Sequence, residues 1–396
     1  KNNWRIHEQF MGKSGAADFP APRPGHNDWY WESGANLFVA NHNVTDKQYT
    51  SDQLSNLLSE FPAVTAVYYL AHNNEGVDVH HPSAILPNPK GWDMTGVWKQ
   101  ACEASGKRFC VYVNSLGLRL NDNNANPGWV RRKADGQPYT SNGHWAEGTR
   151  MCVKSSPDGN GFLEAYFLPL IEEIVSRYKP DGIWVDGDWT IRDNICWCGN
   201  CKKAWELKTG KTAVPTNPND PDWPAWQRLH YERCDEYLKT VANTVHSIHP
   251  DCDYTTNNGW RINTYDPRSA PVHAGALSKD ISLWNAISKT RTLSMKLSSE
   301  EQTPHDIMHV INVPDRISLP RILQEGGLTM AAGSTWHLWV NRVSPDNGFA
   351  LERLRICSEF VQDRNAAVGK SSSRNPIAVL ASETSSQLQK MEGKRN

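Results

Sequence analysis

The sequence has no excess of charge of either sign. Its 396 residues include 42 Lys and Arg against 43 Asp and Glu, which leaves a formal net charge of −1. Nucleic acids and acidic membrane surfaces are bound by basic faces, so this balance argues against either as the main partner. The sequence also lacks any run of about 20 apolar residues, the length that a membrane-spanning helix needs. We therefore expect no nucleic-acid partner and no membrane span.

Signatures of several enzyme classes are also absent. No Gly-rich phosphate loop of the Walker or dinucleotide type follows an early apolar run, which counts against a Rossmann fold. There is no HExxH motif for a metalloprotease. Several other histidines read as solvated or loop residues rather than as ligands: His80, His81, His246, His249 and His305.

Aromatic residues, in contrast, are abundant. The chain has 17 Trp, 12 Tyr and 9 Phe. Flat amphipathic rings stack on sugar faces in binding pockets, although Trp is also common in cores and interfaces. The count is therefore a first hint of a carbohydrate ligand.

Short apolar runs alternate with segments of helical spacing along most of the chain. The apolar runs are residues 37–40, 64–70, 109–113, 182–185, 254–256, 281–284, 307–313 and 335–340. Helical spacing is found around residues 54–61, 94–104, 162–178, 226–246, 319–330 and 349–361. Eight strand candidates with helices between most of them predict an α/β fold, a (β/α)8 TIM barrel, over residues 35–366.

Two flanks fall outside this predicted barrel. Residues 1–34 are rich in Pro, Gly and Trp and are expected to form an irregular N-terminal cover. Residues 367–396 begin with a linker-like polar run and continue into an apolar run at 376–380. We expect this segment to be a linker and the start of a C-terminal domain.

Polar and aromatic residues follow the predicted strands, where (β/α)8 barrels place their active sites. Amide, carboxylate and imidazole groups form hydrogen bonds with hydroxyls, and indoles stack on sugar rings. The open end of the predicted barrel, where these residues gather, therefore suits a polyhydroxylated ligand. His144 is added from a Gly/Asn-rich loop. The candidate substrate-binding residues are His42, His72, Asn73, Asn74, Glu75, Tyr112, His144, Asp188, Trp189, Trp284, His337 and Trp339.

The segment 178–189 (YKPDGIWVDGDW) carries the strongest signal. It resembles the fourth strand of family 29 α-L-fucosidases, in which a Tyr-x-Pro-Asp turn leads into an apolar strand ending in Trp-x-Asp-Gly. That Asp is the nucleophile in the family, so the resemblance implies Asp186 as nucleophile. Residues 38–42 (FVANH), 71–76 (AHNNEG) and 93–115 resemble the first strands of the same family, and the resemblance covers about residues 35–190.

The sequence departs from that family at positions that bind or protonate the sugar. Asn73 and Asn74 stand where the family has histidines, and Trp284-Asn285 stands where many members have Trp-Glu. A retaining glycosidase needs a second carboxyl about 5–5.5 Å from the nucleophile, and an inverting one needs roughly 6.5–9.5 Å. We favour Glu300 or Glu301 as acid/base, although acidic residues there equally suit the start of a helix. Glu75 and Asp188 are the other candidates.

The sequence as a whole predicts a glycoside hydrolase that cleaves an α-L-fucoside or a related sugar, with Asp186 as nucleophile and a carbohydrate as substrate. One alternative is an inverting hydrolase of another sugar, with His or Asp188 as base. Another is a non-catalytic carbohydrate-binding barrel. We expect a secreted or periplasmic location.

Three of the nine cysteines are clustered at Cys196, Cys198 and Cys201. A Cys-x-Cys-x-x-Cys motif that starts ten residues after the strand-four carboxylate is similar to one in family 42 β-galactosidases. There a fourth Cys upstream completes a zinc site, and Cys152 lies 34 residues before Asp186. The resemblance implies a structural Zn²⁺ held by four thiolates. One or two disulfides among the same residues are the alternative, and no cofactor is expected for catalysis.

Overall fold

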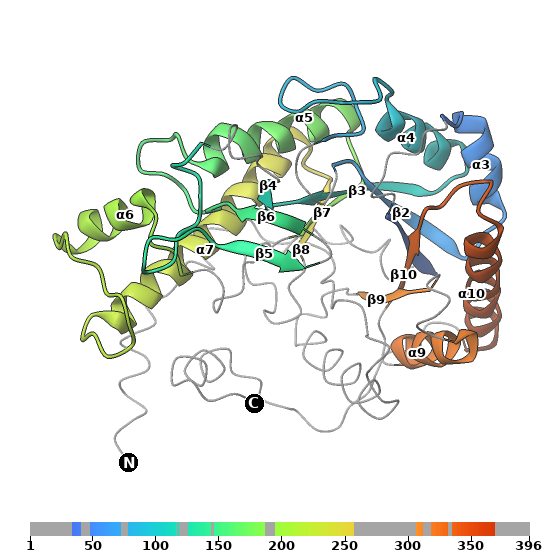
Figure 1. Cartoon of the computed structure of the whole chain (residues 1–396). Coiled ribbons are helices and arrows are strands. Elements are labelled where there is room, and N and C mark those ends of the chain that lie inside the picture. The colour runs from blue at the N-terminus through green and yellow to red at the C-terminus, as the bar shows by residue number, and fades with distance from the viewer. Residues whose placement is uncertain are drawn as a thin grey trace, which may run out of the picture.

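The computed structural model describes residues 34–40, 48–72, 78–115, 117–118, 126–143, 146–186, 195–256, 306–311, 318–331 and 335–368. Within these residues, seven parallel strands form one curled sheet (Figure 1). The strands are β1 (Ala35–Ala40), β2 (Val64–Leu70), β3 (Arg108–Asn114), β7 (Gly182–Asp186), β8 (Asp253–Thr256), β9 (Asp306–Val310) and β10 (Thr335–Asn341). They confirm seven of the eight predicted strands.

The spatial order of the strands is β8-β7-β3-β2-β1-β10-β9. Every neighbouring pair is parallel, and β1 lies between β2 and β10. This is the order that a (β/α)8 barrel has when its sixth strand is left out. The predicted sixth strand, residues 281–284, lies outside the described residues. The fold is therefore a mixed α/β fold with a curled parallel half-barrel, and closure of the barrel stays a prediction.

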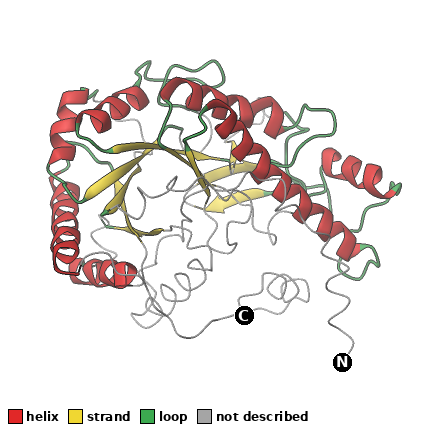
Figure 2. Ribbon diagram, turned by 180° about the vertical axis from the view of Figure 1, so that it is seen from behind, coloured by secondary structure: helices red, strands yellow, loops and turns green. Residues whose placement is uncertain are grey.

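Helices cover the outer face of this sheet (Figure 2). They are α3 (Ser51–Ser59), α4 (Met94–Ala104), α5 (Leu168–Tyr178), α7 (Trp223–Ile248), α9 (Leu319–Ala331) and α10 (Gly348–Val368). A π-helical turn, η2 (Leu163–Phe167), leads into α5. Each of these helices overlaps a predicted one, because apolar residues at helical spacing pack against the sheet. In the part of the chain described, no helix is long and apolar enough to cross a membrane.

Two features were not predicted from the sequence. The first is a small antiparallel sheet of β4 (Gly117–Leu118), β6 (Ala146–Arg150) and β5 (Thr140–Gly143). The second is helix α6 (Gly199–Thr209), which begins within the cysteine cluster. Both lie in connections that follow the carboxyl ends of strands. Their residues lack the long apolar periodicity that marks the elements of the barrel wall.

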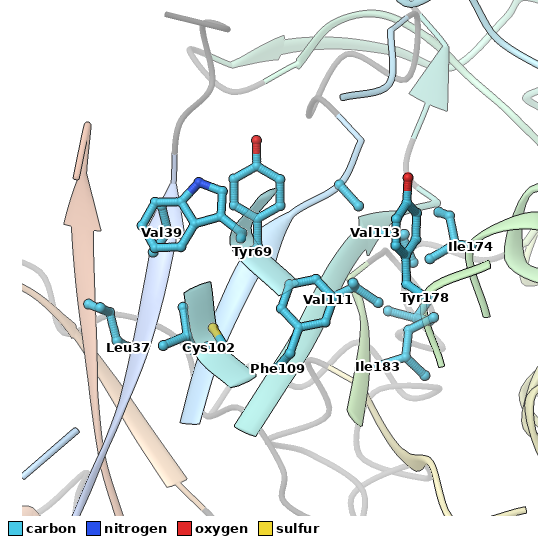
Figure 3. Close-up of a cluster of buried hydrophobic side chains, with 14 of the residues drawn as sticks. Leu37, Val39, Tyr69, Cys102, Phe109, Val111, Val113, Ile174, Tyr178 and Ile183 are labelled. Atoms are coloured by element: carbon cyan, nitrogen blue, oxygen red, sulfur yellow. The ribbon is translucent and has the colours of Figure 1, made fainter. Parts of the chain in front are cut away.

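Both faces of the parallel sheet are buried, which explains why its strands are apolar almost throughout. Side chains alternate between the faces along each strand. The outward set includes Val39, Val111 and Ile183, which pack with helix residues such as Ile174 (Figure 3). The inward set is more aromatic and includes Phe38, Tyr68, Tyr112 and Trp184. The inner face therefore has its own packed core beneath the strand ends.

The turn 178–181 fixes where β7 joins the sheet. Helix α5 ends at Tyr178, its C-cap residue Lys179 has a left-handed φ of 42°, and Pro180 prevents the helix from continuing. Asp181 then accepts hydrogen bonds from the backbone N–H of Phe109 (2.9 Å) and from Arg108 Nη1 (2.9 Å). Both donors belong to β3. The Asp181 carboxylate thus aligns the start of β7 with the start of β3.

Asp181→Ala is expected to destabilise the fold by about 1–3 kcal/mol, because the buried Phe109 N–H loses its acceptor. Asp181→Asn keeps an acceptor oxygen and should cost less. Arg108→Ala removes only the exposed half of the contact and should cost less than about 1 kcal/mol. Urea denaturation of the three variants measures this order. Equal losses for Asp181→Ala and Arg108→Ala would contradict the proposed role of the backbone bond.

Candidate active site

Asp186 is the last residue of β7 and lies at the carboxyl edge of the curled sheet. The register pairs it with Asn114, the last residue of β3. Its backbone oxygen accepts bonds from the Ser115 N–H (2.9 Å) and from Ser115 Oγ (3.2 Å). Its carboxylate Oδ2 accepts a 2.6 Å hydrogen bond from the Tyr112 hydroxyl. Backbone and side chain of Asp186 are therefore both held by β3 and by the residue that follows it.

Tyr112 remains a hydrogen-bond donor in this environment. Burial raises the pKa of its phenol well above the usual value, and the charge and hydrogen bond of Asp186 raise it further. A phenol that keeps its proton can only stabilise a neighbouring carboxylate as a donor. The pair thus consists of a protonated phenol that donates and a partly buried carboxyl group that accepts.

His72 follows β2 and is fully buried. The backbone N–H of Asn114 donates to its Nδ1 at 3.3 Å, so we infer that Nε2 carries the proton. Burial lowers the pKa of His72 to about 3, with smaller contributions from His80 and His81. Among the described residues, Nε2 has no hydrogen-bond partner. His72 is therefore a neutral imidazole with one N–H group that faces no described acceptor.

His337 and Trp339 lie on the inner face of β10 at different depths. His337 is fully buried, and its Nδ1 lies 2.8 Å from Asp306 Oδ2, which also accepts a bond from Asn36 Nδ2 (3.0 Å). Trp339 is partly exposed and donates to Asn341 Oδ1 at 3.0 Å. Trp339 therefore lies nearer the mouth, while His337 belongs to a buried polar network. The substrate-binding roles of both residues stay predictions.

Asp306 and Asn36 were missed at the sequence level. Each stands at the amino-terminal part of a strand, away from the carboxyl ends where the search was made. Asn36 interrupts an apolar run, and that break was the available signal of a buried polar contact.

Three of the histidines expected to be solvated or loop residues are buried. His80 contacts the Tyr69 hydroxyl through Nδ1 (3.2 Å), and His81 contacts Glu173 through Nε2 (3.1 Å). His246 on α7 is also buried, with Nε2 3.1 Å from the Cys252 carbonyl oxygen. His80 and His81 lie in the loop after β2, which the expectation of solvated or loop residues allowed, whereas for His246, a buried helix residue, that expectation was wrong. Each ring has a polar partner, which makes its burial tolerable.

The remaining predicted site residues lie outside the described residues, and their roles stay predictions. They are His42, Asn73, Asn74, Glu75, His144, Asp188, Trp189, Trp284, Glu300 and Glu301. This set contains every candidate for the second carboxyl group.

The four predicted metal-binding cysteines are brought together by the fold. The Sγ atoms of Cys152, Cys196, Cys198 and Cys201 all lie within 4.8 Å of one another, and all four residues are buried. None of them forms a disulfide. Four sulfur donors in a closed group fit the ligand set of a structural zinc ion. The cluster leaves no position for a substrate, so it is separate from the chemistry at Asp186.

The comparisons with known proteins agree with this geometry. Residues 79–268 match the family model described as alpha-L-fucosidase. The matched segment contains β3, β7 and Asp186, as well as the four cysteines. No curated protein sequence matches the chain.

Several solved structures share the fold. α-L-fucosidase isoenzyme 2 from Paenibacillus thiaminolyticus has a TM-score of 0.65 at 15% identity, over 84% of this chain and 50% of that one. The glycoside hydrolase domain of PgaB (BpsB) from Bordetella bronchiseptica has a TM-score of 0.55 at 13% identity, and the match covers 82% of this chain and 98% of that domain. Unliganded α-L-fucosidase AlfC from Lactobacillus casei has a TM-score of 0.50 at 12% identity, and the match covers 87% of this chain and 100% of that one.

This chain therefore spans half the length of the Paenibacillus enzyme and nearly the whole of the other two domains. At these identities, the structures show a shared fold, and the family model adds a shared sequence pattern around β7. Together the comparisons indicate a glycosidase fold with an α-L-fucosidase-type segment at residues 79–268.

Proposed function

We propose that this chain is a glycoside hydrolase of the α-L-fucosidase type, in which Asp186 is the nucleophile. One observation carries the proposal. The segment that matches the fucosidase family contains a strand that ends in a carboxylate, at the carboxyl edge of a curled parallel sheet. That edge is where (β/α)8 enzymes perform their chemistry. Closure of the barrel by the predicted sixth strand, residues 281–284, is part of the same proposal.

In the retaining version of the reaction, Asp186 attacks the anomeric carbon and displaces the leaving-group oxygen. A protonated carboxyl group, from Glu300 or Glu301, gives its proton to that oxygen. The same group, now ionised, takes a proton from water, whose oxygen attacks the anomeric carbon and releases Asp186. The products are the free sugar and an alcohol, and both carboxyl groups return to their starting states.

Tyr112 and His72 act as positioning groups in this scheme. The Tyr112 hydroxyl holds one oxygen of Asp186 and keeps the carboxylate ionised for attack. His72 is neutral, and its Nε2–H is suited to donate to a sugar hydroxyl. Trp339 offers a partly exposed indole near the same mouth.

Glycoside hydrolase activity has more support than the identity of the sugar that is cleaved. Two structures that share the fold are a fucosidase and a glycoside hydrolase domain, whereas the choice of a fucoside as substrate rests on the family model. Export to the periplasm or the medium belongs to the same proposal. An inverting mechanism with Asp188 as base, and a non-catalytic sugar-binding barrel, are the outcomes against which the proposal is tested.

Asp186→Asn is expected to lower kcat/KM by about 10⁴-fold or more, because the nucleophile is lost. A panel of nitrophenyl glycosides that includes the α-L-fucoside measures this and identifies the sugar. Asp52→Asn, at an exposed carboxylate on α3, is the control and should change the rate by no more than about threefold.

Azide tests the covalent role directly. It should restore turnover to Asp186→Gly by occupying the space of the carboxylate and attacking the anomeric carbon. A wild-type chain that binds sugars and cleaves none would contradict the hydrolase proposal. Full activity in Asp186→Asn would remove Asp186 from the mechanism.

Tyr112→Phe is expected to lower kcat/KM by roughly 10- to 100-fold, the value of a hydrogen bond to a charged group. Losing a donor disfavours the ionised carboxylate, so the acid limb of the pH–rate profile should move to higher pH. Tyr178→Phe is a matched control, since its hydroxyl also donates to a carboxylate, Asp93 Oδ1, at 2.6 Å. An acid limb that moves equally in both variants, or in neither, would count against the positioning role.

The neutrality of His72 predicts acid lability. An unfolded chain takes up a proton at this residue as the pH falls through its usual value of 6.5, but the folded chain resists until about pH 3. The unfolded state thus binds more protons in this window, and stability should fall as the pH drops through it. His72→Gln should flatten the decline in urea midpoint between pH 7 and pH 4. Partial burial also lowers the pKa of His249, but without the full burial of His72, so His249→Gln should flatten the decline less. Identical slopes for wild type and His72→Gln would refute the assignment.

A further inference from the structure

The cysteine cluster has the dimensions of a metal–tetrathiolate centre. A tetrahedral zinc ion with Zn–S bonds of about 2.3 Å separates its sulfur atoms by about 3.8 Å. Cys152 Sγ and Cys201 Sγ lie 3.7 Å apart, and no pair in the cluster exceeds 4.8 Å. The spacing fits four ligands around one ion.

Hydrogen-bond donors point at the sulfur atoms. The backbone N–H groups of Arg132 and Cys198 donate to Cys196 Sγ at 3.5 and 3.4 Å. Arg233 Nη1 donates to Cys201 Sγ at 3.2 Å. Donors of this kind stabilise negative charge on metal-bound sulfur and orient the ligands. The surroundings of the cluster are therefore arranged for thiolates.

Two buried cations accompany the cluster. Lys154 is 1% exposed and Arg233 is 5% exposed. Lys154 interacts electrostatically with Cys234, which lies outside the cluster, and with Cys152, Cys201 and Cys196 of the cluster. Arg233 interacts with Cys201, Cys152 and Cys198. A buried cation is costly unless negative charge lies close to it. Four thiolates around a divalent ion carry a net charge of −2, which two cations balance. Four neutral thiols or two disulfides would supply no such charge at the cluster, and among the described residues the charge on Arg233 would then face only the Glu164 carboxylate.

The cluster joins three segments of the chain. The Cys152 N–H donates a hydrogen bond to the Trp129 carbonyl at 2.7 Å, which links Cys152 to the segment that contains Trp129. Cys196, Cys198 and Cys201 form the turn into α6, and Arg233 comes from α7. The indoles of Trp197, Trp205 and Trp226 pack around the sulfur atoms and exclude water. The centre is therefore closed and anchors the connection that leaves β7 at Asp186.

We propose that Cys152, Cys196, Cys198 and Cys201 bind one structural zinc ion, and that Lys154 and Arg233 are the built-in counter-charges of its dianionic core. The proposal rests on these contacts and is independent of the hydrolase activity.

Metal analysis of the chain, purified without chelator, should find about one zinc per chain. Cys196→Ser should lose the metal, whereas Cys357→Ser, a buried cysteine of the main core, should keep it. In case Cys196→Ser fails to fold, a second measurement uses the wild type. Replacement of zinc by Co²⁺ should give sulfur-to-cobalt charge-transfer bands and the visible spectrum of a tetrahedral site.

Lys154→Met tests the counter-charge, because it keeps the length of the side chain and removes its charge. Zinc affinity, measured by competition with a chromogenic chelator, should fall by roughly 10- to 100-fold. Lys202→Met, an exposed cation on α6, should leave it unchanged. A metal-free wild type, bound iron, or disulfides among these cysteines in unreduced peptides would overturn the zinc assignment. Equal affinities for the two lysine variants would overturn the role of Lys154.

Discussion

The pairing of β7 with β3 is the constraint on which the candidate site depends. At one end, the Asp181 carboxylate accepts the Phe109 N–H and fixes the register. At the other end, that register puts Asp186 beside Asn114 and within 2.6 Å of the Tyr112 hydroxyl. A slip of one residue would turn Asp186 to the outer face, where helices cover the sheet. The geometry of the carboxylate is thus set by a contact at the opposite edge of the sheet.

On the inner face of the sheet, packed side chains and candidate site residues lie at different depths. Phe38, Tyr68 and Trp184 fill the middle of the curled sheet, with ring centroids 4.9 Å apart for Phe38 and Trp184 and 6.3 Å for Tyr68 and Trp184. Below them the Asp306–His337 contact is sealed from solvent. Above them lie Asp186 and Trp339, which are partly exposed. This layering gives the carboxylate a rigid floor, which pre-organised catalysis requires.

The strands of the parallel sheet and the helices that cover it were predictable, because burial against the sheet requires apolar residues at regular spacing in the sequence. Helix 94–104 was predicted with its observed bounds, since Asp93 caps its start and its apolar residues repeat regularly. Strand β7 and its terminal Asp186 followed from the turn 178–181. The same reasoning could not find β4 to β6 or α6, which are held by local contacts and the cysteines. It also misjudged His246, which lies on the buried side of α7 and contacts the Cys252 carbonyl oxygen. The four cysteines were grouped correctly, whereas most of the predicted sugar contacts lie outside the described residues.

The central claim is that Asp186 forms a covalent bond to the sugar. A 2-deoxy-2-fluoro-α-L-fucosyl fluoride slows both steps but has a good leaving group, so the glycosyl-enzyme should accumulate. The account predicts that the intact mass rises by one fluorosugar and that peptide sequencing places the label on Asp186. A label on another carboxylate, or turnover of an unmodified fucoside with inversion and no label, would contradict it.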